Sequence, residues 1–129
     1  MQVVAAIIFY NNKVVVTQRQ LSKDPNFSFK YEFPGGKVEK KEALLNALKR
    51  ELREELDIEV FDIKHFYSYD FEYNETTINL KFYTCKTDNV EFKLKVHASF
   101  KLMSINKLRQ LDWLEADYRV IKKIEETYL

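Results

Sequence analysis

Short apolar runs separated by polar turn residues make up the first third of the chain. The runs at 3–9 and 14–17 are rich in β-branched residues, and an Asn-Asn pair at 11–12 lies between them. Two such runs around a short asparagine turn predict a β-hairpin. The segment 18–30 is polar and has no period, which predicts a long loop, and 31–33 predicts a brief strand after it.

The segment 42–56 has a helical period instead. Its apolar residues recur three and four positions apart, at Leu44, Leu45, Leu48, Leu52 and Leu56. At about 100° per residue these leucines form one stripe. We expect this stripe to be the buried face of an α-helix.

The second half of the chain has the pattern of another hairpin followed by helices. The segments 58–73 and 77–85 are rich in β-branched and aromatic residues, and Asn74-Glu75 between them predicts a turn. The remaining predicted elements are an extended stretch at 99–104, a short helical piece at 105–110 and a closing helix at 117–127. Hairpins with separated helices predict an α/β fold in which helices cover a sheet.

Length and charge narrow the class of protein. A chain of 129 residues, 46% of them hydrophobic, predicts one domain spanning 1–129. Its 21 basic and 20 acidic residues leave a net charge of +1, which argues against a protein that coats nucleic acid. The apolar run at 3–9 is too short to span a bilayer and has no basic residue ahead of it, as a signal peptide would. Together with a single cysteine, Cys85, this predicts a cytoplasmic protein without a membrane partner.

Glycine is scarce in this chain and confined to one place. There are only 2 glycines, where average usage predicts about nine. Gly35 and Gly36 stand side by side after Pro34. This placement indicates unusual backbone angles or a close backbone approach at that point, with an ordinary turn as the alternative.

Acidic residues interrupt the leucine stripe of the predicted helix. Glu55 falls inside the stripe, Glu51 on its border, and Glu54 beside them. Like charges one turn apart destabilise a helix, and more so when they are partly desolvated. Protonation, a basic partner or a bound cation would offset them, and closely spaced carboxylates suit Mg²⁺, with Mn²⁺ as a substitute. The alternative is a solvated acidic face.

The spacing around this helix resembles a known family signature. The intervals found in Nudix hydrolases are kept by Gly36, Glu42, Arg50-Glu51-Leu52, Glu54-Glu55 and Ile58. The lead-in 31–39 is similar to the subgroup that contains MutT and the CTP pyrophosphohydrolases, as are, more weakly, 17–19 and 116–117. The departure is Asp57, where the family usually has glycine, and we expect a slightly strained left-handed cap there. The resemblance implies the Nudix fold, a mixed β-sheet sandwiched between helices (α/β/α).

By this resemblance the chain is a hydrolase that cleaves a nucleoside diphosphate linked to another group, with Mg²⁺ or Mn²⁺ as cofactor. A metal neutralises phosphate charge and lowers the pKa of a bound water, which suits this reaction. The family's metal ligands correspond here to Glu51, Glu54, Glu55 and the carbonyl of Gly35. Glu42 would be a supporting acid, and Arg50 would pair with the carboxylates and orient them.

Relatives often carry a glutamate before a histidine in the loop ahead of the predicted strand at 99–104, where this chain has Val96-His97. The difference removes a possible metal ligand and base, and leaves the helix glutamates to position the water. His97 is then a candidate base or phosphate contact, against the alternative of an exposed loop histidine. Arg19 is a candidate contact to phosphate or base, against an ordinary surface arginine.

Besides Arg19, four residues are candidates for the pocket that holds the base. Phe33 is either a stacking wall for the base or part of the core. Asp117 stands where the subgroup reads the base edge. As an acceptor it suits guanine or cytosine, and a helix N-cap is a compatible alternative role. Tyr73 and Thr76, at the second hairpin turn, would border the pocket.

The resemblance implies a nucleoside triphosphate pyrophosphohydrolase that releases a monophosphate and pyrophosphate. The first candidate substrate is 8-oxo-dGTP, which would make the protein a sanitiser of the nucleotide pool in DNA repair, and CTP or 5-methyl-dCTP is the alternative. A Nudix-like module that binds a ligand without catalysis is a third hypothesis, which the complete set of acidic residues disfavours. The expected partner is a small nucleotide, without a stable nucleic-acid complex, and the chain would act as a monomer or homodimer.

Overall fold

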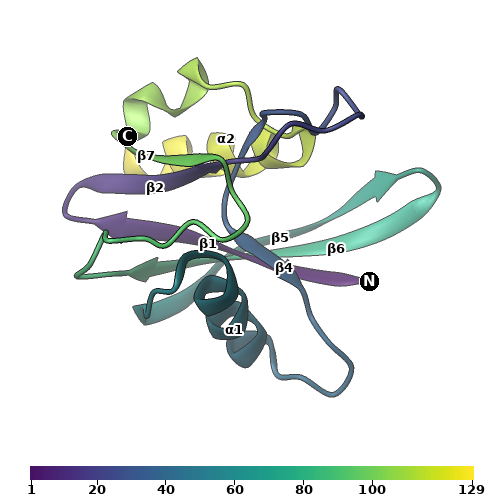
Figure 1. Cartoon of the computed structure of the whole chain (residues 1–129), viewed down its shortest axis with the longest axis horizontal. Helices are drawn as coiled ribbons and strands as arrows, with labels where there is room; N and C mark the ends of the chain where they lie inside the picture. The colour runs from purple at the N-terminus through teal and green to yellow at the C-terminus, as the bar shows by residue number, and fades with distance from the viewer.

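A mixed seven-stranded sheet forms the centre of the molecule, and helices cover both of its faces (Figure 1). The computed structural model describes residues 1–129. The strands are β1 (Gln2–Tyr10), β2 (Lys13–Gln18), β3 (Tyr31–Glu32), β4 (Gly35–Lys37), β5 (Phe61–Tyr73), β6 (Thr76–Lys86) and β7 (Ser99–Met103). The helices are α1 (Leu44–Leu56), α2 (Tyr118–Tyr128) and the 3-10 turns η1 (Ile105–Gln110) and η2 (Glu115–Asp117).

The strand order is β3-β2-β1-β6-β5, with β4 also paired to β1 and β7 to β2. β1 and β6 run parallel, whereas β1 with β2 and β5 with β6 form antiparallel hairpins. Both predicted hairpins are therefore confirmed. Their turns contain Asn11 at a φ of 53° and Asn74 at a φ of 47°, the left-handed conformation that asparagine adopts more readily than most residues.

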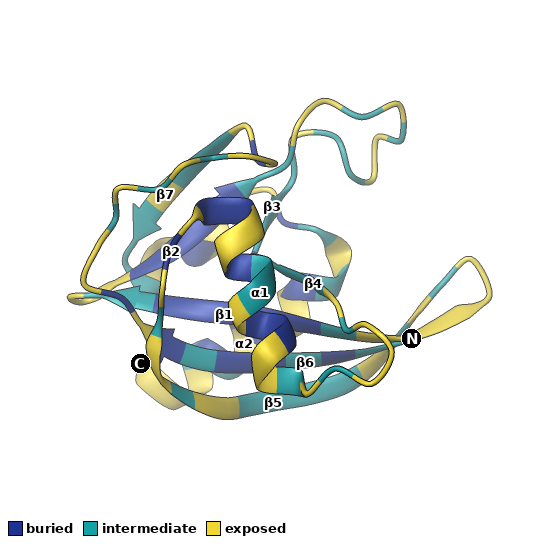
Figure 2. Ribbon diagram, turned by 60° about the horizontal axis from the view of Figure 1, so that its bottom comes forward, coloured by how far each residue is buried: buried dark blue, intermediate teal, exposed yellow.

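The central strand β1 contributes side chains to two separate cores. Successive side chains of a strand point to opposite faces, so Ala5 and Ile7 pack in the core that includes α2. Val4, Ala6 and Ile8 pack in the core beneath α1. Figure 2 shows the buried residues gathered along the inner strands and on the side of α1 that faces the sheet. The predicted α/β/α arrangement is confirmed.

The glycine pair lies in a strand and not in a turn. Gly35 pairs with Ala5 and Gly36 with Val4 in the antiparallel ladder between β4 and β1. Neither glycine has a positive φ, so the expectation of unusual backbone angles was wrong. The close approach is confirmed, because a Cβ on Gly35 would overlap the Val4 carbonyl oxygen and one on Gly36 would overlap the Glu51 carboxylate.

Helix α1 begins at Leu44, two residues after the predicted start at 42, and ends at Leu56 as predicted. Its C-cap is Asp57, whose φ of 55° and ψ of 46° place it in the left-handed region, so the strained cap is confirmed. Leu45 is 43% exposed, contrary to the expectation that it is buried. Ala47 is buried instead, so the buried arc in the first turns is rotated away from Leu45 toward Ala47.

Candidate active site

Two glutamates of α1 face the glycine pair. Glu55 is 9% exposed, and its Oε1 accepts a hydrogen bond from the Gly35 N–H at 3.0 Å. Glu51 lies against Gly36, where any side chain would overlap its carboxylate. The absence of Cβ atoms in β4 therefore lets two carboxylates pack against its backbone.

Arg50 connects the acidic residues around this point. Its Nε donates to Glu42 at 2.7 Å, and its Nη1 donates to Glu51 at 3.0 Å and to Glu54 at 3.1 Å. Its Nη2 donates to the backbone carbonyl of Lys37 at 2.9 Å, so α1 is tied to the end of β4. The hydrogen bond from Arg50, together with one from the Glu39 N–H, holds the pKa of Glu42 below its usual value. The arginine contacts the carboxylates that the family signature predicts, while its role in catalysis stays a prediction.

Burial destabilises the ionised form of Glu55. Desolvation raises the pKa of Glu55 to about 7, and repulsion from Glu32 and Glu51 adds to the increase. Electrostatic attraction to His97 and the hydrogen bond from Gly35 oppose it. As the side chains stand, no three acidic, histidine or cysteine groups converge into a metal-binding cluster. The candidate ligand atoms are nevertheless all oxygens, and the negative charge of the buried Glu55 carboxylate is only partly offset by its neighbours. A hard divalent cation suits such a site.

A polar cavity of about 470 Å³ opens beside Glu55. It is lined by Val3, Arg19, Gln20, Leu21, Ser22, Glu32, Gly35, Gly36, Glu55, Val96 and His97. Arg19 lies at this cavity in an ion pair with Glu32 at 3.2 Å. The structure thus brings Arg19, Gly35 and Glu55 together around one space. Their roles toward phosphate and metal stay predictions.

His97 is buried, contrary to the alternative of an exposed loop histidine. It is 3% exposed, and its Nε2 lies 2.8 Å from Oε2 of Glu32. The reason is that its loop folds back onto the rest of the chain: Lys95 N donates to Glu55 O at 3.1 Å and Ala98 N to Gln18 O at 2.8 Å. Val96, which replaces the family's glutamate, lies on the surface at the cavity rim.

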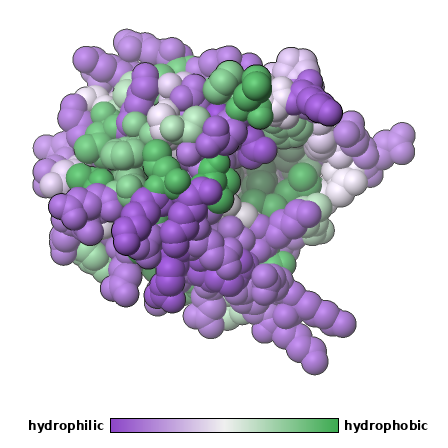
Figure 3. Space-filling view, viewed as in Figure 1, coloured by the Kyte–Doolittle hydropathy of each residue, from purple (hydrophilic) through white to green (hydrophobic).

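A second, apolar cavity of about 230 Å³ lies next to the polar one. Figure 3 shows a hollow with hydrophobic residues in its interior on this side of the molecule. The lining residues are Val3, Asn26, Phe27, Phe71, Tyr73, Ile78, Leu80, Leu114, Glu115 and Ala116. Val3 of β1 lines both cavities, so the two spaces border the same residue of this strand.

Tyr73 lies in this apolar cavity, as predicted, whereas Thr76 does not line it. The Tyr73 hydroxyl donates to Asp24 at 3.0 Å, and its ring meets Phe27 edge to face with the ring centroids 5.3 Å apart. These contacts dock the 19–30 loop onto the β5–β6 hairpin. Phe27 was missed in the sequence because nothing local distinguishes one aromatic in a polar loop.

Phe33 and Asp117 are neighbours in the interior of the molecule. Phe33 is 4% exposed and packs on Trp113 with a centroid distance of 4.8 Å, so the core alternative describes its position. Asp117 is also buried, and its Oδ2 accepts the Phe33 N–H at 3.3 Å. Asp117 occupies the N-cap position of α2, as the alternative predicts, but its side chain makes no capping hydrogen bond there. Burial, with the nearby charge of Glu32, raises the pKa of Asp117 well above its usual value.

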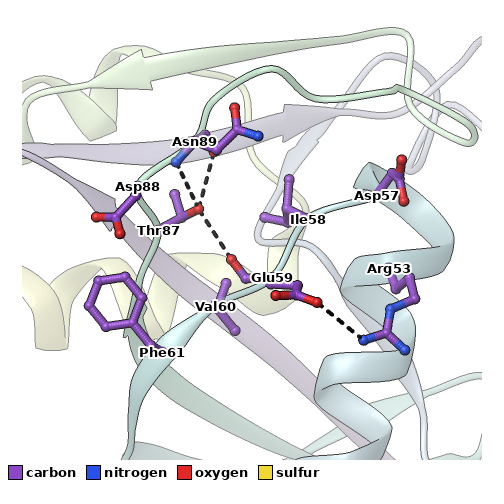
Figure 4. A pocket seen from close by; sticks show the side chains of 9 residues that line it. All are labelled: Arg53, Asp57, Ile58, Glu59, Val60, Phe61, Thr87, Asp88 and Asn89. Carbon is purple, nitrogen blue, oxygen red and sulfur yellow. Dashed lines mark hydrogen bonds and ion pairs between the residues drawn. The ribbon is translucent and has the colours of Figure 1, made fainter.

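The largest cavity, of about 530 Å³, is elsewhere (Figure 4). Arg53 and Glu59 form a long ion pair of 4.0 Å at its edge. The Thr87 hydroxyl donates to the carbonyls of Glu59 and Asn89. These groups stabilise the loops that surround the cavity, and none of the predicted site residues lines it.

No helix of the structure is both long enough and apolar enough to cross a bilayer.

The chain is similar in sequence and in fold to known proteins. A family model described as the NUDIX domain matches residues 1–124. An 8-oxo-dGTP diphosphatase from Buchnera aphidicola subsp. Acyrthosiphon pisum is 33% identical over 118 residues, which is 88% of each chain. The CTP pyrophosphohydrolase of Escherichia coli is 42% identical over 79 residues, which is 61% of this chain and 57% of that protein. The solution structure of the E. coli ORF135 protein superposes with a TM-score of 0.79 at 29% identity, covering 97% of this chain and 88% of that one.

Proposed function

Because the chain belongs to the Nudix hydrolase family, we propose that it hydrolyses nucleoside triphosphates to a monophosphate and pyrophosphate. The observation that carries this proposal is the pair of cavities, one apolar and one polar, that share Val3 in their walls. A nucleotide has an apolar, flat base and a highly charged phosphate chain. The apolar cavity suits the base and the polar cavity suits the phosphates, so one nucleotide would lie across β1 with each part in a matching environment.

The base would bind between the 19–30 loop and the β5–β6 hairpin. Phe27 and Tyr73 supply aromatic surface on the cavity wall. Asp117 would read the base edge through Oδ1, since Oδ2 is engaged with Phe33. With its raised pKa, a protonated Asp117 would donate a hydrogen bond as well as accept one. The stacking role considered for Phe33 is not part of this proposal, because its ring is buried in the core.

The phosphates would bind in the polar cavity near Arg19 and the acidic side of α1. Nudix hydrolases generally use divalent metal ions, and we propose Mg²⁺, with Mn²⁺ as a substitute, held by Glu51, Glu54, Glu55 and the Gly35 carbonyl. When bound, the cation would neutralise phosphate charge and lower the pKa of the attacking water.

The remaining chemistry would be carried by side chains of this chain. Arg50 would keep Glu51 and Glu54 in place, and Glu42 would keep Arg50 in place, through the hydrogen bonds described above. With valine at position 96, the carboxylate that positions the water would come from α1: Glu51, Glu54 or Glu55. Arg19 would bind phosphate oxygens, which its planar guanidinium suits.

The preferred base is 8-oxoguanine in this proposal, so the protein would clear oxidised nucleotides before they reach DNA. Relatives named 8-oxo-dGTP diphosphatase support this preference over most of the chain. Cytosine is the second candidate, favoured by the 42% identity to a CTP pyrophosphohydrolase. The protein would act in the cytoplasm as one domain, as a monomer or homodimer, without a stable nucleic-acid complex.

The test is release of pyrophosphate from 8-oxo-dGTP, dGTP, CTP and 5-methyl-dCTP, each with Mg²⁺, with Mn²⁺ and with a chelator. We expect chelator-sensitive release with the highest kcat/KM for 8-oxo-dGTP. Preference for the cytosine nucleotides would replace the substrate and keep the reaction. Nucleotide binding by calorimetry without any turnover would refute the reaction and favour a non-catalytic binding module.

A further inference from the structure

One wall of the polar cavity is built from three side chains in contact. The side chain of His97 is 1% exposed, and its Nε2 lies 2.8 Å from Oε2 of Glu32. The other oxygen of that carboxylate, Oε1, lies 3.2 Å from Nη1 of Arg19, whose side chain is 41% exposed. Glu32 therefore joins a buried histidine to an arginine at the open side of the cavity.

The backbones of all three residues are fixed at the end of β2. Gln18, the last residue of β2, pairs with Tyr31 of β3 and Ser99 of β7. Arg19 N donates to Lys30 O at 2.8 Å, and Ala98 N donates to Gln18 O at 2.8 Å. The segments that carry Arg19, Glu32 and His97 therefore meet at one rigid point of the sheet, and the histidine cannot leave it without breaking backbone hydrogen bonds.

One nitrogen of the His97 ring faces the Glu32 carboxylate. A carboxylate oxygen accepts hydrogen bonds, so Nε2 carries a proton and donates it to Oε2 of Glu32. Nδ1 is buried and has no hydrogen-bond partner. Oε1, the other oxygen of the carboxylate, accepts the hydrogen bond from Arg19.

Ordering the Arg19 side chain in advance would strengthen its binding of phosphate. A long arginine side chain loses considerable rotamer freedom when it is fixed on a ligand, and this loss weakens binding unless the side chain is ordered beforehand. Glu32 holds one end of the guanidinium, and the Phe27 ring lies 5.3 Å from its Cζ. Only Nη1 is engaged in a hydrogen bond, so the other N–H groups remain free for phosphate oxygens.

We propose that His97 is a positioning residue that acts through Glu32 to hold Arg19 in the polar cavity for the phosphates of the substrate. This proposal rests on the proposed function, which puts the phosphates in that cavity. His97 itself does not contact the substrate. Its Nε2–H fixes Oε2 of Glu32, so the carboxylate presents Oε1 to Arg19 in one orientation.

The test is a double-mutant cycle between His97→Ala and Arg19→Ala, measured on the nucleotide that the wild-type protein hydrolyses fastest. Each single variant should raise KM about tenfold, the effect of one charge-assisted hydrogen bond, with a smaller change in kcat. The double variant should match Arg19→Ala alone, because His97 acts only through Arg19. His97→Gln, whose amide N–H reaches about as far as Nε2, should restore most of the wild-type KM. His65→Ala is the matched control, since His65 bonds Ser68 on β5, and it should leave KM unchanged.

Additive effects of the two single variants would refute the proposal, and so would a normal KM in a folded His97→Ala protein. Failure of His97→Gln to improve on His97→Ala would count against it as well. A wild-type protein that hydrolyses no nucleotide would refute the proposed function instead. The same cycle is then measured on the affinity for inorganic pyrophosphate, where non-additivity supports the link between His97 and Arg19 and additivity overturns it.

Discussion

Replacing each glycine of β4 by alanine should separate the chemistry of the site from the stability of the fold. A Cβ at Gly36 would lie 2.6 Å from Glu51 Oε1, whereas ordinary contact begins at 3.4 Å. The neighbour is the end of a flexible side chain, so the Glu51 carboxylate can retreat by about 1 Å, a displacement that costs on the order of 100-fold in rate when it affects a catalytic group. Gly36→Ala should therefore fold normally and lose about 100-fold in kcat.

Gly35→Ala meets backbone instead. Its Cβ would overlap the Val4 carbonyl oxygen and lie 2.6 Å from Ala5 Cα, and neither atom can move unless β4 separates from β1. Overpacking of this kind costs about 3 kcal/mol or more, which should lower Tm by on the order of 10 °C for a domain of this size.

The assay is turnover with Mg²⁺ on the preferred nucleotide, together with thermal melts followed by circular dichroism. Gly35→Ala should lose stability, and Gly36→Ala should lose activity at an unchanged Tm. Full activity in Gly36→Ala would refute the role of Glu51 in the site. Equal melting temperatures for the two variants would refute the assignment of Gly35 to a backbone contact.

Three further predictions follow from the same geometry. Glu54→Gln removes a proposed ligand charge without changing size, so kcat should fall by about 100-fold or more at an unchanged Tm. Leu48 is fully buried, so Leu48→Ala should cost about 2 to 5 kcal/mol in urea unfolding and leave the turnover of the remaining folded protein near normal. Burial raises the pKa of Asp117 in the folded state, so its contribution to stability is present below about pH 4 and is lost as the pH rises toward the folded pKa. Asp117→Asn abolishes this loss, and its stability relative to the wild type should rise between pH 4 and pH 7; a constant difference would contradict the cause given for the shift.

Local patterns in the sequence predict most of the elements. The leucine period locates α1, and asparagine turns locate both hairpins, because these signals depend on residues within a few positions of one another. The acidic residues of α1 and the missing family glutamate at Val96 are also visible in the chain. Their arrangement around Arg50 follows from one helix and the strand beside it.

Features that depend on distant segments could not be predicted in the same way. The burial of His97 results from hydrogen bonds between its loop, α1 and β2. The apolar cavity combines side chains from β1, the 19–30 loop, the β5–β6 hairpin and the segment before α2, and no local pattern marks them as neighbours. The sequence did not predict β4 as a strand, because its pairing with β1 is visible only in three dimensions.

The parallel pairing of β1 with β6 has a consequence for synthesis of the chain. β1 leaves the ribosome before its partner β6, which begins only at Thr76, and the register joins Val3 to Leu80. Until that segment emerges, one edge of a very apolar strand has no partner, and such edges are prone to intermolecular pairing. Nascent chains stalled before β6 should therefore depend on chaperones that shield β1, and chains stalled beyond Lys86 should depend on them much less.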